Sequence, residues 1–401
     1  MPGDCRDGIL NPMFPDSLLK ARYKRHFAKH SFTFHYIVPP GWENEAFHEL
    51  KRWVTLEESY IDYGGISFKH NLNCIPVIHS RVRIGIRLLM RLAEFTCLSY
   101  AQLKKRTLMI PFELHLGFPE TIRLKCQSKS SWLYSEKALF DRTAELLVDY
   151  YQSLDHKIKV LEYAPDQPGV TLYVMLKHNR MYLSLDLTGN PLYKRGITPY
   201  KSKAPLRENI AAAALNLIPR RDFRLIYDPF CGSGTLLMEA YHHYTGYPQL
   251  QRHYDYQTLP MRWFVDPVPD EPSAPVSPPL FIGQDRDWKA LSVFRHNLEH
   301  TPDHPRISMI LADSLCCQPH PIPQPVLILA NPPYGRRLLN RQQAERLVEQ
   351  WIDLSFNHFP DLTLGVFFPP YEGLKKKAWQ IRAFPYGGLD LCFYVFKNWK
   401  S

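Results

Sequence analysis

One stretch of the sequence decides the fold: LIYDPFCGSGTLLMEA, at residues 225–240. It begins with a short apolar run, which has the length of a buried strand. A tight turn with two glycines, Gly232 and Gly234, follows, and residues from Thr235 onward have the composition of a helix start. A strand, a glycine turn and a helix in this order are typical of the phosphate or nucleoside pocket of a doubly wound α/β sheet.

The details of this turn narrow the class of ligand. A dinucleotide-binding fingerprint has three glycines and places a pyrophosphate on the helix N-terminus, whereas this turn has only Gly232 and Gly234. Asp228 lies just upstream, where a carboxylate can meet a cationic amine. A ligand with an amino-acid tail and a nucleoside but no phosphate, such as S-adenosylmethionine, therefore fits better than NAD. For the two glycines taken alone, an ordinary glycine-containing turn is the alternative.

Strands and helices alternate in the second half of the chain, which predicts a parallel sheet. Helices are expected from Leu206, from Thr235 and over 289–300. The further strands are expected at 280–283, 307–311, 326–330 and 364–368, with a final hairpin over 378–397. Residues 241–279 form a proline-rich insertion with few helical signals.

Three acids, Asp228, Asp285 and Asp313, follow successive strand ends. In a doubly wound sheet these carboxyl ends line one crevice. We assign Asp285 to the ribose hydroxyls of the ligand and Asp313 to the exocyclic amine of its adenine. A loop-capping role is the alternative for Asp313.

The strand expected at 326–330 ends in Asn331-Pro332-Pro333-Tyr334-Gly335. An aromatic amine is hard to methylate because its lone pair is delocalised into the ring. A side-chain amide oxygen from Asn331 and a rigid backbone carbonyl can accept both N–H bonds and localise that lone pair. The two prolines hold the chain without offering competing N–H donors, and Tyr334 offers a face on which an extruded base can stack. A plain proline turn after a strand is the alternative.

Composition limits the class of protein. The chain has 401 residues, of which 45% are hydrophobic, and a formal net charge of +10. Residues 1–200 carry 27 Lys and Arg against 20 Asp and Glu, so most of the excess is N-terminal and suggests a polyanion-binding region. The eight cysteines show no C-x-x-C spacing, which argues against a disulfide framework or a zinc site. Because no signal-peptide core or membrane-length apolar run occurs, we expect a cytoplasmic protein without a membrane partner.

The sequence of the N-terminal half predicts an α+β region, built on small mixed sheets over 32–190. Residues 1–31 are expected to form a basic arm, because no acid occurs between Leu18 and Trp42. This arm is expected either to contact a nucleic-acid backbone or to be an ordinary solvated tail. A helix is expected over 79–95. It would carry Arg81, Arg83, Arg87 and Arg91, which are expected either to face RNA phosphates or to form an ordinary solvated helix face. The other expected elements are a strand at 32–38, a helix at 43–53, a hairpin at 59–68, a strand at 122–126, a helix at 136–151 and strands at 170–176 and 180–187.

With these motifs the chain resembles the THUMP-containing RNA guanine-N2-methyltransferases, in particular the bacterial large-subunit rRNA type. Residues 228–235 are similar to the first methyltransferase motif of that family, and residues 331–335 are similar to its fourth. Residues 186–196 resemble the join between THUMP module and catalytic domain, and the resemblance covers about residues 45–397. The first 30 residues and the 241–279 insertion depart from the family pattern.

The resemblance implies a Rossmann-like, S-adenosylmethionine-dependent α/β methyltransferase domain at 196–401, behind a ferredoxin-like plus THUMP RNA-binding region at 32–195 and the arm at 1–31. The residues assigned to the cofactor are Asp228, Phe230, Gly232, Gly234, Thr235, Asp285, Asp313 and Asn331. Those assigned to catalysis are Asn331, Pro332, Pro333 and Tyr334, and those assigned to RNA are Arg81, Arg83, Arg87, Lys194 and Arg195. Charge reversal at Arg81, Arg83 and Arg87 is expected to weaken RNA binding and flatten its salt dependence.

The leading functional hypothesis is transfer of one methyl group to the N2 amine of a guanine in structured RNA, with 23S rRNA as the first expectation. The alternatives are a tRNA guanine-N2-methyltransferase, a DNA adenine-N6-methyltransferase, a glutamine-N5 protein methyltransferase and a non-catalytic RNA-binding assembly factor. The target nucleotide and the oligomeric state stay open.

Overall fold

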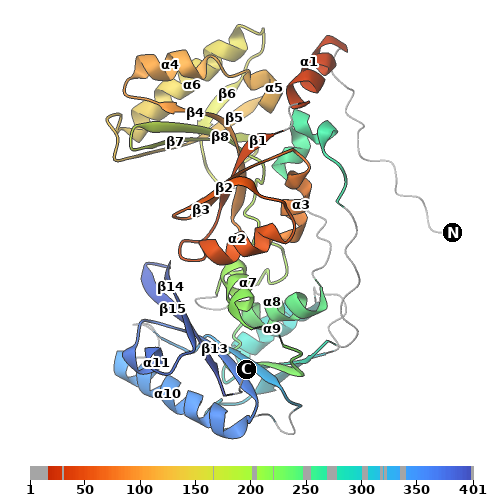
Figure 1. The fold of residues 1–401 in the computed structure, drawn as a ribbon, viewed down its shortest axis with the longest axis vertical. Coiled ribbons are helices and arrows are strands. Elements are labelled where there is room, and N and C mark those ends of the chain that lie inside the picture. The colour runs from red at the N-terminus through yellow and green to blue at the C-terminus, as the bar shows by residue number, and fades with distance from the viewer. Residues whose placement is uncertain are drawn as a thin grey trace, which may run out of the picture.

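The protein contains two mixed sheets, one in each half of the chain (Figure 1). The computed structural model describes residues 17–28, 31–165, 167–200, 206–219, 221–246, 254–268, 278–299, 306–316, 319, 323–334 and 340–398. Among these residues, no helix is both long enough and apolar enough to cross a membrane.

The N-terminal region is built on one eight-stranded sheet in the order β2-β3-β1-β4-β8-β7-β5-β6. Its strands are β1 (Phe32–Ile37), β2 (Glu57–Asp62), β3 (Gly65–His70), β4 (Arg87–Thr96), β5 (Thr121–Lys129), β6 (Lys159–Glu162), β7 (Val170–Lys177) and β8 (Arg180–Asp186). The expectation of several small sheets was wrong, because β4 pairs with β1 on one side and with β8 on the other.

The prediction of a helix over 79–95 was also wrong. A short helix, α3 (Cys74–Arg81), ends where that helix was expected to begin, and β4 follows it. The first four residues of β4, from Arg87 to Met90, are all buried. A strand covered on both faces shows no alternation of apolar and polar residues, so its periodicity cannot be told from that of a buried helix.

The remaining helices of this region are α1 (Ser17–Phe27), α2 (Glu43–Lys51), α4 (Tyr100–Thr107), α5 (Phe112–Leu116) and α6 (Glu136–Gln152). The helix over 43–53, the hairpin at 59–68 and the paired strands β7 and β8 are confirmed. Residues 17–28, in contrast, are not a free arm. Tyr23 and Phe27 of α1 are buried, and Arg22 forms an ion pair with Glu113. Residues 1–16 lie outside the described part.

The C-terminal domain is a doubly wound sheet in the order β11-β10-β9-β12-β13-β15-β14. Its strands are β9 (Leu225–Asp228), β10 (Leu280–Asp285), β11 (Ile307–Leu311), β12 (Val326–Ala330), β13 (Leu362–Phe368), β14 (Gln380–Tyr386) and β15 (Leu389–Lys397). The first five run parallel to one another, and β15 runs antiparallel to β13. The expected parallel sheet and the final hairpin are therefore confirmed.

Helices cover both faces of this sheet. The helices are α7 (Glu208–Leu217), α8 (Thr235–Thr245), α9 (Trp288–Glu299), α10 (Arg341–His358) and α11 (Glu372–Lys375). Ile226 and Leu327 pack in the same core as α7, α8 and α9, whereas Tyr227 and Ile328 pack with Trp351 of α10 on the other face (Figure 1). Because both faces are covered, the central strand β12 is apolar at every position, as is typical of parallel sheets. This arrangement confirms the predicted fold class.

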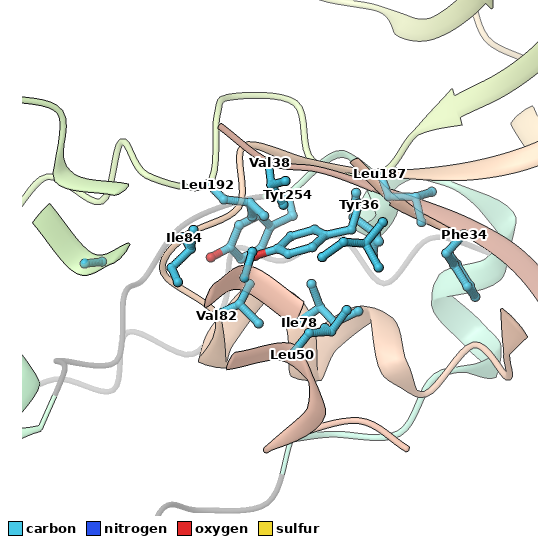
Figure 2. Packing of buried hydrophobic residues seen from close by; sticks show 14 of the residues in the cluster. Phe34, Tyr36, Val38, Leu50, Ile78, Val82, Ile84, Leu187, Leu192 and Tyr254 are labelled. Carbon is cyan, nitrogen blue, oxygen red and sulfur yellow. The ribbon is translucent and has the colours of Figure 1, made fainter. Parts of the chain in front are cut away.

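Part of the 241–279 insertion packs against the N-terminal region. Two 3₁₀ helices, η1 (Asp255–Thr258) and η2 (Pro260–Phe264), lie within it. The hydroxyl of Tyr254 donates to the carbonyl of His79 at 2.9 Å, and the ring joins the core around Tyr36 and Leu192 (Figure 2). The rings of Phe264 and Phe27 lie 5.2 Å apart, so η2 also holds α1. The insertion therefore ties the C-terminal half to the N-terminal half.

The last hairpin makes a second join between the halves. Trp42, which precedes α2, packs its ring 5.0 Å from that of Phe384 in β14, and Arg382 of the same strand forms an ion pair with Glu45 of α2. These contacts join segments from opposite ends of the chain. Both joins set the orientation of the N-terminal region relative to the sheet that carries the candidate site.

Candidate active site

Parallel pairing brings the ends of the central strands to one edge of the C-terminal sheet. Tyr227 of β9 pairs with Ile328 of β12, and Asp228 pairs with Gly283 of β10. The residues that follow these strands therefore meet at the carboxyl edge, which is where doubly wound sheets bind ligands. This register brings the ends of β9, β10 and β12 to the same edge. Asp228, Asp285 and Asn331 are at those ends, as the sequence predicts.

The glycine turn is locked onto the end of β10. Gly232 and Gly234 have positive φ angles of 54° and 83°, in the left-handed region that favours glycine. The Gly232 N–H donates to Oδ2 of Asp285 at 2.9 Å, and the Cys231 N–H donates to the carbonyl of Gln284 at 3.0 Å. The turn therefore has a defined shape before any ligand binds.

Gly234 is required for a second reason, which is packing. It is the N-cap of α8, and a Cβ built there would lie 2.1 Å from a ring carbon of Phe294 in α9. Phe294 is fully buried, so its ring has no free space into which to move. The second glycine of the motif thus lets α9 approach the turn closely.

Replacing Gly234 with alanine is expected to lower the free energy of unfolding by about 2–5 kcal/mol, from the left-handed backbone and the overlap with Phe294 together. Gly387 is the matched control, because its φ is 60° but a Cβ there meets nothing within 4 Å. Gly387→Ala should therefore lose only about 1–2 kcal/mol. Chemical denaturation of both variants measures the difference, and equal losses would show that Phe294 does not restrict the turn.

Asp228 is fully buried at the end of β9. Its Oδ1 accepts the Phe230 N–H at 3.0 Å. Burial raises the pKa of this carboxyl well above its usual range, and the nearby carboxylate of Asp285 raises it further. No lysine or arginine in the described ranges forms an ion pair with Asp228. A buried carboxyl in this state is suited to receive a cation from a ligand.

The other two acids differ in how firmly they are held. Asp285 accepts two backbone N–H groups, from Gly232 at 2.9 Å and from Asp287 at 2.9 Å, so its carboxylate has one orientation. Asp313 accepts the Leu315 N–H at 2.9 Å and lies 3.7 Å from the guanidinium of Arg286. Asp313 therefore does cap its loop, and its role toward an adenine stays a prediction.

Asn331 carries an unsatisfied polar atom. It follows β12, whose five residues are all buried, and its Oδ1 is shielded from water without a hydrogen-bond partner among the described residues. Buried amide oxygens are normally hydrogen-bonded, and leaving one unpaired destabilises a protein by roughly 1–3 kcal/mol. An unpaired acceptor at this edge of the sheet indicates a site that awaits a donor.

Tyr334 borders a cavity of about 730 Å³. Its ring lies 6.0 Å from that of Phe368, nearly edge to face, and burial raises the pKa of its hydroxyl. Pro369 and Pro370, just after β13, and Glu345 of α10 also line the cavity. The cavity has room for an aromatic base. Its walls were not found from the sequence, because neither α10 nor the Pro-Pro pair after β13 carries a motif.

The two remaining cofactor assignments lie in the same turn. The ring of Phe230 packs at 72° against Trp351 of α10, with centroids 5.3 Å apart, so its main contact is structural. Thr235 is buried at the first position of α8, and its Oγ1 has no partner among the described residues. Thr235, but not Phe230, offers an unsatisfied polar atom to a ligand. Gly335, the last residue of the second motif, lies outside the described part.

Comparison with known proteins identifies the domain. Residues 195–361 match the family model described as UPF0020, RMKL-like, methyltransferase domain. The match contains both motifs and confirms the family resemblance.

Curated relatives are similar over more of the chain. The ribosomal RNA large subunit methyltransferase K/L of Syntrophotalea carbinolica is 28% identical over 83% of this chain and 48% of its own length. The protein of the same name from Shewanella frigidimarina is 24% identical, over 91% of this chain and 52% of its own length. The chain thus spans about half the length of these relatives.

Solved structures share the fold of the whole chain. SMU.472 in complex with SAH aligns with a TM-score of 0.78 at 21% identity, over 93% of this chain and 100% of the other. TrmN from Thermus thermophilus aligns with a TM-score of 0.69 at 19% identity, over 92% and 99%. The N-terminal region and the C-terminal domain are therefore arranged in a fold already known from other proteins.

The residues that were assigned to RNA binding lie mostly inside the protein. Arg87 is buried, with its guanidinium bonded to Asp186 at 2.5 Å and to Tyr163 at 3.0 Å. Arg83 is buried as well, and Arg195 forms a buried ion pair with Glu239 of α8. The RNA-binding assignment was therefore wrong for these three arginines, because their charges have no access to a phosphate.

Arg81 and Lys194 are more accessible. Arg81 is half-buried, with its guanidinium 5.4 Å from the ring centroid of Trp53, and Lys194 is exposed. Charge reversal at Arg81, Arg83 and Arg87 therefore does not test an RNA-binding surface. Two of the three substitutions, at Arg83 and Arg87, would place a carboxylate in the core.

Arg195→Ala is expected to lower the free energy of unfolding by about 3–5 kcal/mol, because it removes the guanidinium that is paired with the buried carboxylate of Glu239. Lys194→Ala, on the neighbouring exposed residue, should change it by no more than about 0.5 kcal/mol. Chemical denaturation measures both values. An Arg195→Ala protein that is as stable as the wild type but binds RNA more weakly would restore the interpretation from sequence.

Proposed function

We propose that the chain is an S-adenosylmethionine-dependent RNA methyltransferase that transfers one methyl group to the N2 amine of a guanine in structured RNA, with 23S rRNA as the expected substrate. The RMKL-like domain and relatives named ribosomal RNA large subunit methyltransferase K/L support the proposal. The observation that carries it is the buried amide oxygen of Asn331, which has no hydrogen-bond partner in the described part of the chain and lies at the carboxyl edge of the sheet.

The described residues fit S-adenosylmethionine. The carboxyl of Asp228 suits the α-ammonium group of the cofactor, which would stabilise its ionised form. Thr235 and the N–H groups in the first turn of α8 suit the carboxylate of the cofactor. Asp285, fixed at the end of β10, suits the ribose hydroxyls. The bound cofactor supplies an electrophilic methyl group on a sulfonium.

Asn331 acts on the other reactant. Its Oδ1 accepts one N–H of the guanine amine, and a backbone carbonyl of the Asn-Pro-Pro segment accepts the second. These two bonds hold the nitrogen lone pair out of the ring plane, toward the methyl donor. The hydrogen-bonding capacity of Asn331 exists before the base arrives, so little reorganisation is needed. The amine loses its proton after transfer, and no strong base is required.

The cavity beside Tyr334 receives the base. A base inside a helix cannot reach a site at the edge of a sheet, so it must be extruded from its stack. Tyr334 and Phe368 offer aromatic surface that replaces part of the lost stacking. The polar walls from α10 and the last hairpin face the same cavity.

Methyl transfer from labelled S-adenosylmethionine tests the proposal. Purified full-length chain is incubated in parallel with unmodified 23S rRNA, unmodified tRNA and duplex DNA, and the labelled nucleoside is identified after digestion. We expect label in N2-methylguanosine from rRNA. Label in tRNA alone would favour the tRNA alternative, and label in DNA adenine would favour the DNA alternative. Absence of label from all three, with no cofactor binding by calorimetry, would overturn the enzyme proposal.

A further inference from the structure

Two aromatic side chains stand out on the surface of the N-terminal region. Trp132 and Tyr134, in the loop between β5 and α6, are 76% and 83% exposed. Leu133, between them, is half-buried. Large apolar side chains exposed next to one another commonly mark a binding surface. Neither side chain is part of the hydrophobic core or of the candidate active site.

The loop that carries them is well ordered by hydrogen bonds. The Trp132 N–H donates to Oδ1 of Asn179 at 2.7 Å, and the Asn179 N–H donates to Oγ of Ser131 at 2.9 Å. Ser128 Oγ donates to the Leu133 carbonyl at 2.7 Å. Ser130 has a φ of 49°, a left-handed conformation that persists only where its surroundings impose it. The backbone beneath the two rings is therefore fixed, which reduces the entropy lost on binding.

Two exposed lysines flank this loop. Lys129 precedes it and Lys137 follows it, and both are exposed. Three more exposed cations lie on the last turn of α4, a helix that packs beside α6 over the same face of the sheet (Figure 1). These three are Lys104, Lys105 and Arg106.

The charges of α4 are not neutralised locally. None of its three cations forms an ion pair with another described residue, whereas Lys137 lies 3.9 Å from a carboxylate oxygen of Asp141 on the next turn of α6. That pair is exposed on both sides, so it competes only weakly with an anionic ligand. The nearby carboxylate of Glu136 accepts the Ser128 N–H. The surface is therefore suited to a polyanion.

We propose that this surface, the aromatic platform of Lys129, Trp132, Tyr134, Lys137 and the last turn of α4, binds unpaired nucleotides of the RNA substrate. The inference rests on the proposed function and names the part of the RNA that the N-terminal region recognises. Aromatic side chains stack on unpaired bases of any identity, while lysines contact the backbone phosphates. A continuous duplex hides the faces of its bases, so the platform selects single-stranded segments, such as a loop or an end.

Fluorescence anisotropy with the full chain tests the platform. The probe is a labelled oligo(A) RNA of roughly ten nucleotides, within the site size of single-strand binders, used alone and annealed to its complement. Trp132→Ala and Tyr134→Ala should each weaken binding of the single strand by about fivefold or more, with little effect on the duplex. Trp132→Phe keeps an aromatic face and should retain most of the affinity.

Tyr63→Ala is the matched control. Tyr63 is 74% exposed at the tip of the β2–β3 hairpin in the same region, but its neighbour is Asp62 rather than a cluster of cations. This variant should bind the single strand as the wild type does. The double variant Lys104→Ala/Lys105→Ala should lower the slope of log affinity against log salt by about 0.7 for each phosphate that it no longer neutralises.

Two results would overturn the platform. Unchanged affinity of both alanine variants would assign the aromatic pair to a protein partner instead, and an equal loss for single strand and duplex would show that no base is stacked. The methyl-transfer assay on rRNA separates this failure from that of the proposed function. A wild-type protein that methylates rRNA while Trp132→Ala binds RNA normally refutes the platform alone, whereas a wild type that binds through the platform but transfers no methyl group refutes the enzyme.

Discussion

Asn331→Ala is expected to reduce the rate of methyl transfer by about a hundredfold to a thousandfold, as removal of one preorganised hydrogen-bonding group at a reacting atom does in other enzymes. The Kd for S-adenosylmethionine should change little, because the amide acts on the base rather than on the cofactor. Single-turnover transfer to RNA measures the rate, and calorimetry measures the Kd. The loss should appear in the rate constant rather than in the affinity for RNA.

Asn216→Ala is the control for this variant. Asn216 lies on α7 and, like Asn331, has a buried Oδ1 without a partner among the described residues, but it is not at the carboxyl edge of the sheet. Its replacement should leave transfer unchanged. Parallel loss of transfer and cofactor binding in Asn331→Ala would move Asn331 from catalysis to a structural role.

Asp228→Asn is expected to weaken binding of S-adenosylmethionine by at least about thirtyfold, since truncating one partner of a buried charge pair loses roughly 2–5 kcal/mol. Asparagine keeps an Oδ1 for the Phe230 N–H, so the turn itself should survive. Asp287→Asn is the control on the same rim, because Asp287 is exposed and its Oδ1 only caps the start of α9. Calorimetry gives both Kd values, and an unchanged Kd in Asp228→Asn would remove Asp228 from the cofactor site.

The pKa of Asp228 also predicts two effects of pH. Because the folded protein raises this pKa, the carboxyl binds its proton more tightly when folded. Its contribution to stability is therefore present in acid and is lost as the pH rises from the ordinary carboxyl value through the folded one. Asp228→Asn cannot ionise, so the cofactor-free variant should be more stable than the wild type at neutral pH. In the wild type, the affinity for the cofactor should rise over the same pH range.

Both predictions concern residues that were identified from local sequence. The residues before Asp228 and before Asn331 are apolar or aromatic runs of strand length, and each run ends at a polar side chain that can meet a ligand. Once the sheet is known to be parallel, both must lie at one edge. Gly232 and Gly234 are also identified from local sequence, since glycine adopts the positive φ angles that other residues avoid. These features needed no knowledge of distant contacts.

The walls of the cavity and the aromatic platform could not be predicted from local sequence. Phe368 and Glu345 reach Tyr334 from different elements, and no spacing in the sequence connects them. The aromatic platform depends on Asn179, whose side chain holds the loop of Trp132 from 47 residues away. Exposure is a property of the folded surface, so the sequence does not show whether a tryptophan is exposed or buried.

The sequence by itself determined the parallel sheet, the glycine turn and the polar residues at its edge, because backbone geometry and strand periodicity act between near neighbours. Only the tertiary structure decided which charges are available to a ligand. Arg87 is neutralised by Asp186 at 99 residues' distance, Arg22 of α1 by Glu113 at 91 and Arg195 by Glu239 at 44. An arginine binds whichever carboxylate the fold places beside it, so its availability to RNA is set by long-range contacts.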